Sequence, residues 1–207
     1  MKRYLTEFIG TFFLVLVVAL TGSNPLAIGA ILMVMVYAGN LSSGAHYNPA
    51  VTLAVLYRRK IELSEAIMYC VAQLIAGVLA GIVALHLSGN APALEPGMGR
   101  TSLQATLAEA LFTFVVAFVV LNVSTHSKTK INSYFGIAIG FAMMAAFFAG
   151  GPISGGAFNP AIAIGITFTH AVWGGGNWNH IWIYLVGPII GGALGGVAFD
   201  YLNVEEL

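Results

Sequence analysis

The sequence predicts an all-α membrane protein in which six transmembrane helices and two re-entrant half-helices form an inverted repeat. Three observations predict this fold. The chain of 207 residues is 58% hydrophobic and only 8% charged, which is more apolar surface than one soluble core of this size can bury. It holds six apolar segments of spanning length and two shorter ones. Both shorter segments begin with the same triplet, Asn48-Pro49-Ala50 and Asn159-Pro160-Ala161.

The six long segments cover residues 4–23, 26–41, 64–87, 103–123, 132–150 and 180–202. The pair Asn24-Pro25 closes a short turn between the first two segments. The two shorter segments, 48–57 and 159–170, cannot span a bilayer alone. The first long segment resembles a secretory signal after Lys2-Arg3, but it contains Glu7 and lacks a clean cleavage site, so we expect it to stay as a span.

Composition also excludes several classes of protein. Eight basic and eight acidic residues give a formal net charge of zero, so no basic patch can neutralise several phosphates, and we expect no nucleic-acid partner. The single cysteine, Cys70, lies in an apolar run and is interpreted as a small packing residue. We therefore expect no disulfide, no bound metal and no cofactor.

The positions of the basic residues predict the orientation. Seven of them lie at the N-terminus, after the first short segment, or between the fourth and fifth spans, where cytoplasmic positive charge is expected: Lys2, Arg3, Arg58, Arg59, Lys60, Lys128 and Lys130. Only Arg100 lies in the long connection around 89–102, which is expected outside. The tryptophans Trp173, Trp178 and Trp182 suit the outer aromatic belt. Both termini are then cytoplasmic, in a protein of the plasma membrane.

The two halves of the chain match each other. We expect one transmembrane channel domain, 1–207, built from a first repeat of about 1–95 and a second of about 100–207. The segment that begins Glu7-Phe8 resembles the one that begins Glu109-Ala110, and the triplets correspond. Each repeat has three spans, an odd number, so the second repeat must insert upside down relative to the first.

The short segments have the length needed to meet at mid-membrane. Ten to twelve helical residues make roughly 15 to 18 Å, so two of them end to end cover a hydrocarbon core of about 30 Å. Asparagine is a preferred N-cap and proline a preferred first helical residue, so both helices should begin at the triplets with their N–H groups facing that meeting point. The two helix dipoles place partial positive charge there, which opposes cations and protons.

The approaches to the triplets, 42–47 and 150–158, are rich in glycine and serine and are expected to be irregular. Irregular backbone at membrane depth must be buried in protein or line a cavity. Its carbonyl groups, with the amides of Asn48 and Asn159, form a polar stripe between otherwise apolar walls. This arrangement suits small neutral solutes that move in single file.

These residues resemble the aquaporin and glycerol-facilitator family over essentially the whole chain. The resemblance rests on Ser-Gly-Ala-His-x-Asn-Pro-Ala-Val-Thr at 43–52, the second triplet, the Glu7 and Glu109 pair, and Gln73 matched with Pro188. It implies a homotetramer with one pore per subunit, and it makes Glu7 and Glu109 buried carboxylates that brace the two loops. A proton relay is the alternative for these carboxylates. His46 resembles the family's loop-bracing histidine, and no second ligand has the spacing for a metal.

The chain departs from the family at the residue that follows the second triplet. Most members have arginine there, near the outer mouth, whereas this chain has Ile162. The resemblance places the other selectivity-filter positions at Ile28, Phe147 and Gly156, so the ring has no charge and no side-chain donor. The ring could be wide and admit glycerol, urea, ammonia, hydrogen peroxide or neutral metalloid hydroxides, or it could dewet and resist water. In the other interpretation, Ile162 faces lipid or protein in a different register.

The sequence thus predicts a passive channel for small uncharged solutes, which are water and/or glycerol, urea, ammonia, hydrogen peroxide and metalloid hydroxides, and it leaves the extent of water permeation open. An enzyme would need a nucleophile with a base, or a carboxylate pair, at the midplane, and none emerges. A coupled transporter would need an ion site, for which no paired charges exist. The remaining alternative is a non-conducting structural or junction protein, for which small-residue spacing would supply helix contacts. That spacing occurs at Gly77, Gly81, Gly187, Gly191 and Gly195 and is interpreted as packing between the repeats.

Overall fold

The structure is a computed structural model that describes residues 1–129 and 132–206. Lys130, whose cytoplasmic placement is predicted above, lies outside the described residues, as do Ile131 and Leu207. The described chain folds into six long and two short helices without strands, which confirms the predicted fold class. The long helices are α1 (Lys2–Leu20), α2 (Pro25–Ser43), α4 (Leu63–Ser88), α5 (Ser102–Val120), α6 (Phe135–Ser154) and α8 (Ile181–Leu202); the short ones are α3 (Pro49–Tyr57) and α7 (Pro160–Trp173). A π-helical turn (Leu121–Thr125) continues α5, and 3-10 turns follow at Ser127–Thr129 and Val204–Glu206.

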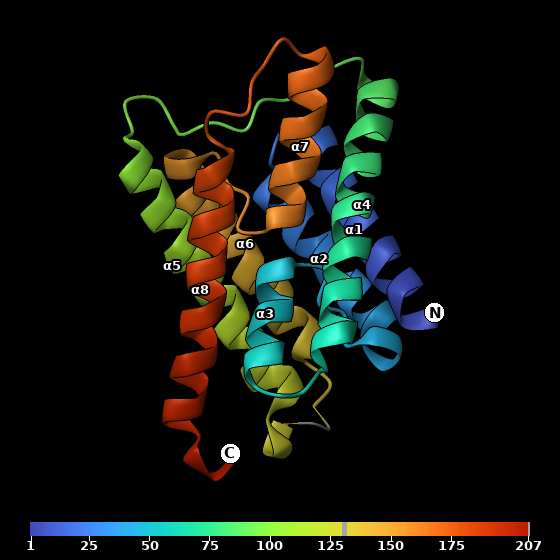
Figure 1. Ribbon diagram of the computed structural model, residues 1–207, viewed down its shortest axis with the longest axis vertical. Coiled ribbons are helices and arrows are strands. Elements are labelled where there is room, and N and C mark those ends of the chain that lie inside the picture. The colour runs from blue at the N-terminus through green and yellow to red at the C-terminus, as the bar shows by residue number, and fades with distance from the viewer. Residues whose placement is uncertain (130–131, 207) are drawn as a thin grey trace.

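The two short helices lie in line in the middle of the bundle, with α7 above α3 and with α4 and α8 beside them (Figure 1). The main packing partners are α1 with α4, α2 with α6, and α5 with α8. Helix α3 of the first half packs on α8 of the second half, and α7 packs on α4. Each half therefore inserts its short helix against the spans of the other half.

The outer face of the bundle is apolar, as lipid contact requires. On α4, exposed side chains recur every four residues at Ile67, Val71, Ile75, Leu79 and Val83. Their exposed fractions, 36–54%, would be unusual for a row of large apolar side chains on a soluble surface. This row is a lipid-facing stripe, because all six long helices have the length and apolar composition to cross a membrane.

The glycines singled out in the sequence lie at close helix contacts. A Cβ on Gly77 would come within 2.4 Å of the carbonyl oxygen of Ala161, so α4 and α7 touch backbone to backbone across the two halves. Gly187 and Gly191 meet α5 instead, within the second half, and Gly195 lies against the same helix. The prediction of packing between the repeats is right for the α4 pair, Gly77 and Gly81, and wrong for these three glycines of α8.

Three boundaries of α2 and α6 differ from the prediction. Helices α2 and α6 continue through Ser43 and Ser154 before a left-handed glycine ends each of them, so part of both approaches is helical. Gly150 of α6 is compensated by packing, since a Cβ there would meet the rings of Phe112 and Phe158 within 2.8 Å. Helix α6 also starts three residues later than expected, because Asn132 folds into a turn in which its Oδ1 accepts from Tyr134 N at 3.1 Å.

Candidate pore

The two loops that lead into the short helices have the same backbone conformation. Gly44 and Gly155 end the preceding helices in the left-handed region. Tyr47 and Phe158, three residues further on, have φ of 50° and 51°, which non-glycine residues adopt at a cost of about 1–3 kcal/mol each. Both rings are fully buried. Such strain persists only where the surrounding structure holds it, and two buried carboxylates do so here.

Glu7 on α1 holds the first loop. Its Oε1 accepts from the Ser43 hydroxyl at 2.7 Å and from His46 N at 2.9 Å, and its Oε2 accepts from Tyr47 N at 2.7 Å. The Gln73 amide adds a fourth hydrogen bond at 2.8 Å. The side chain is inaccessible to solvent, so every acceptor site is used by the protein.

Glu109 on α5 holds the second loop in the same way. Its Oε1 accepts from the Ser154 hydroxyl at 2.7 Å and from Ala157 N at 3.0 Å, and its Oε2 accepts from Phe158 N at 2.6 Å. Pro188 stands where the first half has Gln73, so the fourth bond has no counterpart. Both carboxylates hydrogen-bond the loops, and among the residues that the structure describes neither contacts a second acidic group that a proton relay would use.

The triplets meet through a reciprocal pair of hydrogen bonds. Asn48 Nδ2 donates to the carbonyl of Phe158, and Asn159 Nδ2 donates to the carbonyl of Tyr47, both at 2.9 Å. Each asparagine Oδ1 also accepts from the backbone N–H two residues later, at 2.9 Å, and so caps its helix. An amide nitrogen has two protons, and each uses one in these bonds. One N–H donor per asparagine remains for a solute.

A narrow chamber lies beside the two asparagines. Its volume is about 10 Å³, roughly the space for one water molecule. Polar contacts are available on one side only, from the two triplets and the loop before the first of them. The rest of the wall is apolar and comes from the inner faces of four spans and the start of α3: Leu14, Leu32, Val51, Val116, Val120, Ile139 and Met143. A solute here is held by few donors and cannot be solvated on all sides.

His46 lies at the junction between this chamber and a wider vestibule, because it lines both. Its Nδ1 is 3.1 Å from the Thr52 hydroxyl, which also donates to the Asn48 carbonyl and accepts from Gln73. A hydroxyl has one proton, so the tautomer that satisfies all three contacts has its proton on Nδ1. The ring nitrogen Nε2 is then left as an acceptor. His46 therefore lines the path as well as bracing the loop.

The vestibule measures about 450 Å³ and opens at one end of the molecule. Its walls include Arg3, Lys60 and Glu206 from three distant parts of the chain, with Ser127 of the α5–α6 connection. We call this end the proximal mouth. The opposite end, where the segments 89–101 and 174–180 lie, is the distal mouth (Figure 1).

The predicted filter residues lie on the distal side of the triplets. Ile28 and Ile162 are fully buried and Phe147 is 2% exposed. Phe147 lies directly against Gly156, since a Cβ there would be 3.1 Å from the ring. Val51, which holds the matching place after the first triplet, lines the chamber, whereas Ile162 is buried outside the chamber's lining. The space left by glycine at 156 is thus partly taken by an aromatic ring.

Sequence reasoning predicted apolar walls but did not identify the residues that form them. The spans are hydrophobic on all sides, so no periodicity separates the faces toward lipid from those toward the chamber. It also passed over Thr52, which links His46 to Gln73. The threonine follows the first triplet by two residues, and its hydroxyl bonds back one turn, a contact that the short-helix prediction could have included.

The sequence is similar to known channel proteins along its whole length. The family model described as Major intrinsic protein matches residues 1–199. Nodulin-26 of Glycine max is 33% identical over 100% of this chain and 79% of its own length. Aquaporin AqpM of Methanothermobacter thermautotrophicus is 30% identical over 99% of this chain and 98% of its own length.

The fold has a close structural counterpart. The X-ray structure of the aquaglyceroporin from Plasmodium falciparum superposes with a TM-score of 0.86 and covers 96% of this chain and 95% of its own, at 20% sequence identity. At that identity the likeness concerns the fold alone. The matches of sequence establish more: this chain belongs to the major intrinsic protein family of aquaporins and glycerol facilitators, and is a passive channel for small solutes and not an enzyme.

Proposed function

We propose that this channel conducts small uncharged solutes of modest polarity, such as ammonia, glycerol, urea, hydrogen peroxide or neutral metalloid hydroxides, past an apolar ring that limits water. The observation that carries the proposal is the reciprocal asparagine pair beside a chamber of about 10 Å³. It supplies two free N–H donors, and the N-termini of α3 and α7 converge on it. Donors and positive helix ends favour neutral solutes with an acceptor atom and oppose cations.

The selectivity filter in this proposal is Ile28, Phe147, Gly156 and Ile162. Three apolar side chains and a glycine offer no side-chain hydrogen bond, so a strongly hydrated solute loses water there without replacement. Relatives support this class of solute: a glycerol uptake facilitator-like protein of Lactiplantibacillus plantarum is 33% identical over 100% of both chains. Dewetting of the same ring would limit water more than it limits less polar solutes.

We further propose the assembly and orientation that the family implies. The chain forms a homotetramer with one pore per subunit, in the plasma membrane, from two repeats of about 1–95 and about 100–207. The proximal mouth faces the cytoplasm, because Arg3, Arg58, Lys60 and Lys128 lie at that end. Labelling of Lys60 by an impermeant amine reagent in intact cells tests the orientation; modification from outside contradicts it.

A solute panel tests the proposed function. Proteoliposomes are challenged by stopped flow with water, glycerol, urea, ammonia and hydrogen peroxide, with empty liposomes as the baseline. We expect the flux of at least one of the neutral solutes to lie well above that of empty liposomes. For water, we expect a smaller increase over empty liposomes than for that solute. A second candidate, a poorly conducting structural protein, is favoured by the complete burial of Ile28 and Ile162. Flux at the baseline for all five solutes supports that candidate and overturns the channel proposal.

A further inference from the structure

Helix α3 connects the midplane chamber with the proximal mouth. It begins at Pro49 under the Asn48 cap and ends at Tyr57, so its nine residues span roughly 14 Å. Asn48 and Val51 line the chamber, and Val55 lines the vestibule. A short helix with its backbone hydrogen bonds intact moves as one body. The position of its proximal end therefore sets the position of Asn48.

The contact between α3 and α8 is smooth. The two helices run in the same direction, with Gly192 beside Ala50 and Gly196 beside Tyr57. A Cβ on Gly192 would come within 2.4 Å of the Ala50 carbonyl oxygen, and one on Gly196 within 2.8 Å of the Tyr57 ring. Side-chain ridges that fit into grooves normally fix the packing of two helices, and glycine has no side chain to form a ridge. The place of α3 along α8 thus depends on other interactions.

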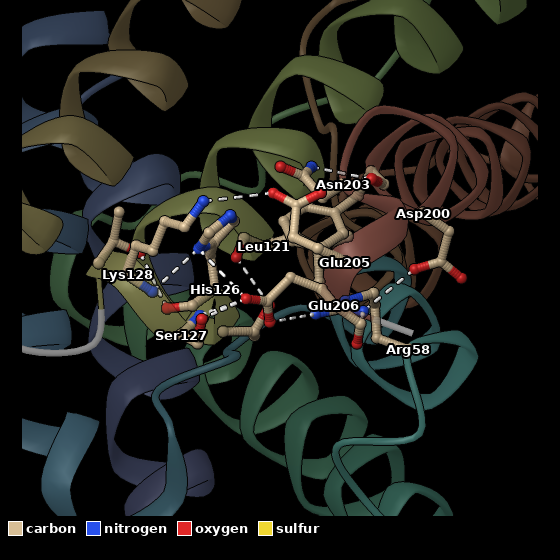
Figure 2. A network of polar contacts seen from close by, with 12 residues as sticks. Arg58, Leu121, His126, Ser127, Lys128, Asp200, Asn203, Glu205 and Glu206 are labelled. Carbon is tan, nitrogen blue, oxygen red and sulfur yellow. Dashed lines mark hydrogen bonds and ion pairs between the residues drawn. The ribbon is translucent and has the colours of Figure 1, made fainter.

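A buried cation at the end of α3 supplies them, and Figure 2 shows Arg58 facing Asp200 and Glu206. The guanidinium is only 2% exposed. Its Nη1 donates to Asp200 Oδ1 at 3.2 Å, and its Nη2 lies 3.6 Å from Glu206 Oε2. The guanidinium carbon lies 4.0 Å from the centre of the Phe199 ring. An unpaired buried charge is costly, so these partners, which belong to α8 or follow it, tie α3 to one place on the second repeat.

The segment 204–206 after α8, which we call the docked segment, is itself held in place. Glu206 is 6% exposed, and its Oε1 accepts from Ser127 N at 3.1 Å and from the Ser127 hydroxyl. Glu205 differs, because its pair with Lys128 at 3.5 Å joins side chains that are 56% and 73% exposed. The carboxylate that meets the buried cation is therefore fixed, and its neighbour is not.

The second short helix is held in another way. Thr169 of α7 has the place that Arg58 has after the first triplet. The next residue, His170, donates from Nδ1 to the carbonyl of Ala91 at 3.0 Å, which joins the end of α7 to the distal connection. Helix α7 is thus an internal reference for a change that concerns Arg58 alone.

We propose that Arg58 is a positioning residue for the pore. Its pairs with Asp200 and Glu206 fix α3 on α8, and this holds Asn48 at the midplane chamber. Without the cation, α3 shifts along the glycine face of α8, and the chamber of about 10 Å³ becomes wider. The effect on solutes rests on the proposed channel function, whereas the anchoring of α3 can be measured without it.

Four variants separate the anchor from its charge. Arg58→Gln removes the buried cation. Arg59→Gln is the matched control, because it removes the same charge at the next residue, which is exposed. Arg58→Lys keeps the charge and should restore part of the anchoring. Asp200→Asn removes one of the two carboxylates, and it tests the same anchor with a smaller change if Arg58→Gln does not fold.

Hydrogen exchange of backbone amides, measured by mass spectrometry on the full chain in detergent, reports on the anchor. We expect Arg58→Gln to raise exchange in the peptide that covers α3 about five-fold or more, because a helix without its anchor opens more often. Exchange in the peptide that covers α7 should stay near that of wild type, since the contact of His170 is unchanged. Asp200→Asn should have a smaller effect of the same kind, and Arg59→Gln should leave both peptides near wild type.

The ratio of glycerol flux to ammonia flux in proteoliposomes reports on the pore. We expect Arg58→Gln to raise this ratio about two-fold or more, because a wider chamber favours the larger solute. Arg58→Lys should bring the ratio back toward that of wild type, and Arg59→Gln should not change it. A merely structural role of Arg58 would lower both fluxes in proportion and leave the ratio as it is.

Each outcome decides part of the proposal. Equal exchange of α3 in wild type and Arg58→Gln, or an equal rise in α3 and α7, shows that Arg58 does not anchor α3. A rise confined to α3 with an unchanged flux ratio contradicts its role in positioning the pore. A wild-type protein without flux above empty liposomes overturns the proposed function, and the exchange assay then still decides whether Arg58 anchors α3.

Discussion

The first and second re-entrant loops share one backbone conformation but have different side chains. Both leave a helix at a left-handed glycine, place an aromatic residue at positive φ, and end at an asparagine that caps a short helix. They differ in the side chains that this backbone presents. The first loop has His46 where the second has Ala157, and the first triplet is followed by Val51 where the second is followed by Ile162. The shared backbone conformation lets both loops line the path, and the different side chains make the two ends of the path chemically different.

The difference also extends to the space at each end. The proximal side opens through His46 into a vestibule of about 450 Å³ with charged walls. On the distal side, Phe147 lies against Gly156, and the predicted ring is buried and apolar. The inverted repeat thus gives two loops with the same backbone conformation, but the two ends of the path differ in size and in charge. Selection among solutes is expected at the distal end.

The largest effects should come from the two supporting carboxylates. Glu7→Ala and Glu109→Ala each leave several buried donors without a partner, and we expect a loss of about 3 kcal/mol or more of stability. Glu7 accepts one hydrogen bond more than Glu109, from Gln73, so Glu7→Ala should lose about 1 kcal/mol more stability than Glu109→Ala. Thermal unfolding in detergent measures both. Equal losses would show that the Gln73 bond contributes nothing to the difference between the loops.

Substitution of either asparagine should have the same effect, because the two loops share one backbone conformation. Asn48→Ala and Asn159→Ala each remove a helix cap, worth about 1 kcal/mol, and one reciprocal bond of similar size. We expect the two variants to lose the same stability within about 0.5 kcal/mol and to lose solute flux alike. Strongly unequal losses in unfolding assays would contradict the equivalence of the two loops.

Replacing His46 should make the two loops more alike. His46→Ala gives the first loop the residue type of Ala157 and removes one neutral hydrogen bond, which costs about 1 kcal/mol. It also widens the junction between vestibule and chamber, so we expect faster flux without a change in the order of preferred solutes. Stopped-flow rates for glycerol, urea and ammonia test this, and a reordered preference would place selection at the proximal end.

The smallest effect should be the pH dependence of the docked carboxylate. Hydrogen bonds from Ser127, aided by the charge of Arg58, hold the pKa of Glu206 below its ordinary value of 4.5. A lowered pKa stabilises the folded state above the ordinary value, and the contribution is lost as the pH falls through the folded value. The melting temperature of wild type should therefore exceed that of Glu206→Gln above about pH 5, and the difference should shrink as the pH falls below 4.5 through the folded value.

A melting difference that disappears already near neutral pH would contradict this assignment. Comparison with Glu206→Gln isolates the carboxylate, because the neighbouring side chains His126, Lys128, Arg58 and Asp200 are the same in both proteins. Glu205→Gln provides the second control, since that side chain is exposed and its pair is screened.

Much of the fold could be predicted from the sequence because its signals are local. Six apolar runs, two capped triplets and the match between halves predict the spans and the meeting point of the short helices. The boundaries at Ser154 and Phe135 were less predictable, since close packing at Gly150 and a turn at Asn132 override propensity. Apolar walls were predicted, but the residues that form them could not be, because spans that are hydrophobic on all sides do not reveal which face meets lipid.

The docked segment was unpredictable for a different reason. Glu206 meets Ser127 and Arg58 across separations of 79 and 148 residues, and only the packed bundle brings them together. Nothing in the local sequence marks Ser127 and the two glutamates as partners. Their interaction depends on burial of Arg58 against Phe199, which no local pattern encodes.

The central claim is that the distal ring selects solutes through its lack of charge, and one substitution tests it most directly. Ile162→Arg adds a cationic donor to the ring, while Ile162→Val keeps it apolar and copies the first loop. In proteoliposome stopped-flow assays we expect Ile162→Arg to lower glycerol and urea flux relative to water, and Ile162→Val to keep the wild-type ratios. Glycerol and urea fluxes in Ile162→Arg equal to those of the parent would contradict the account.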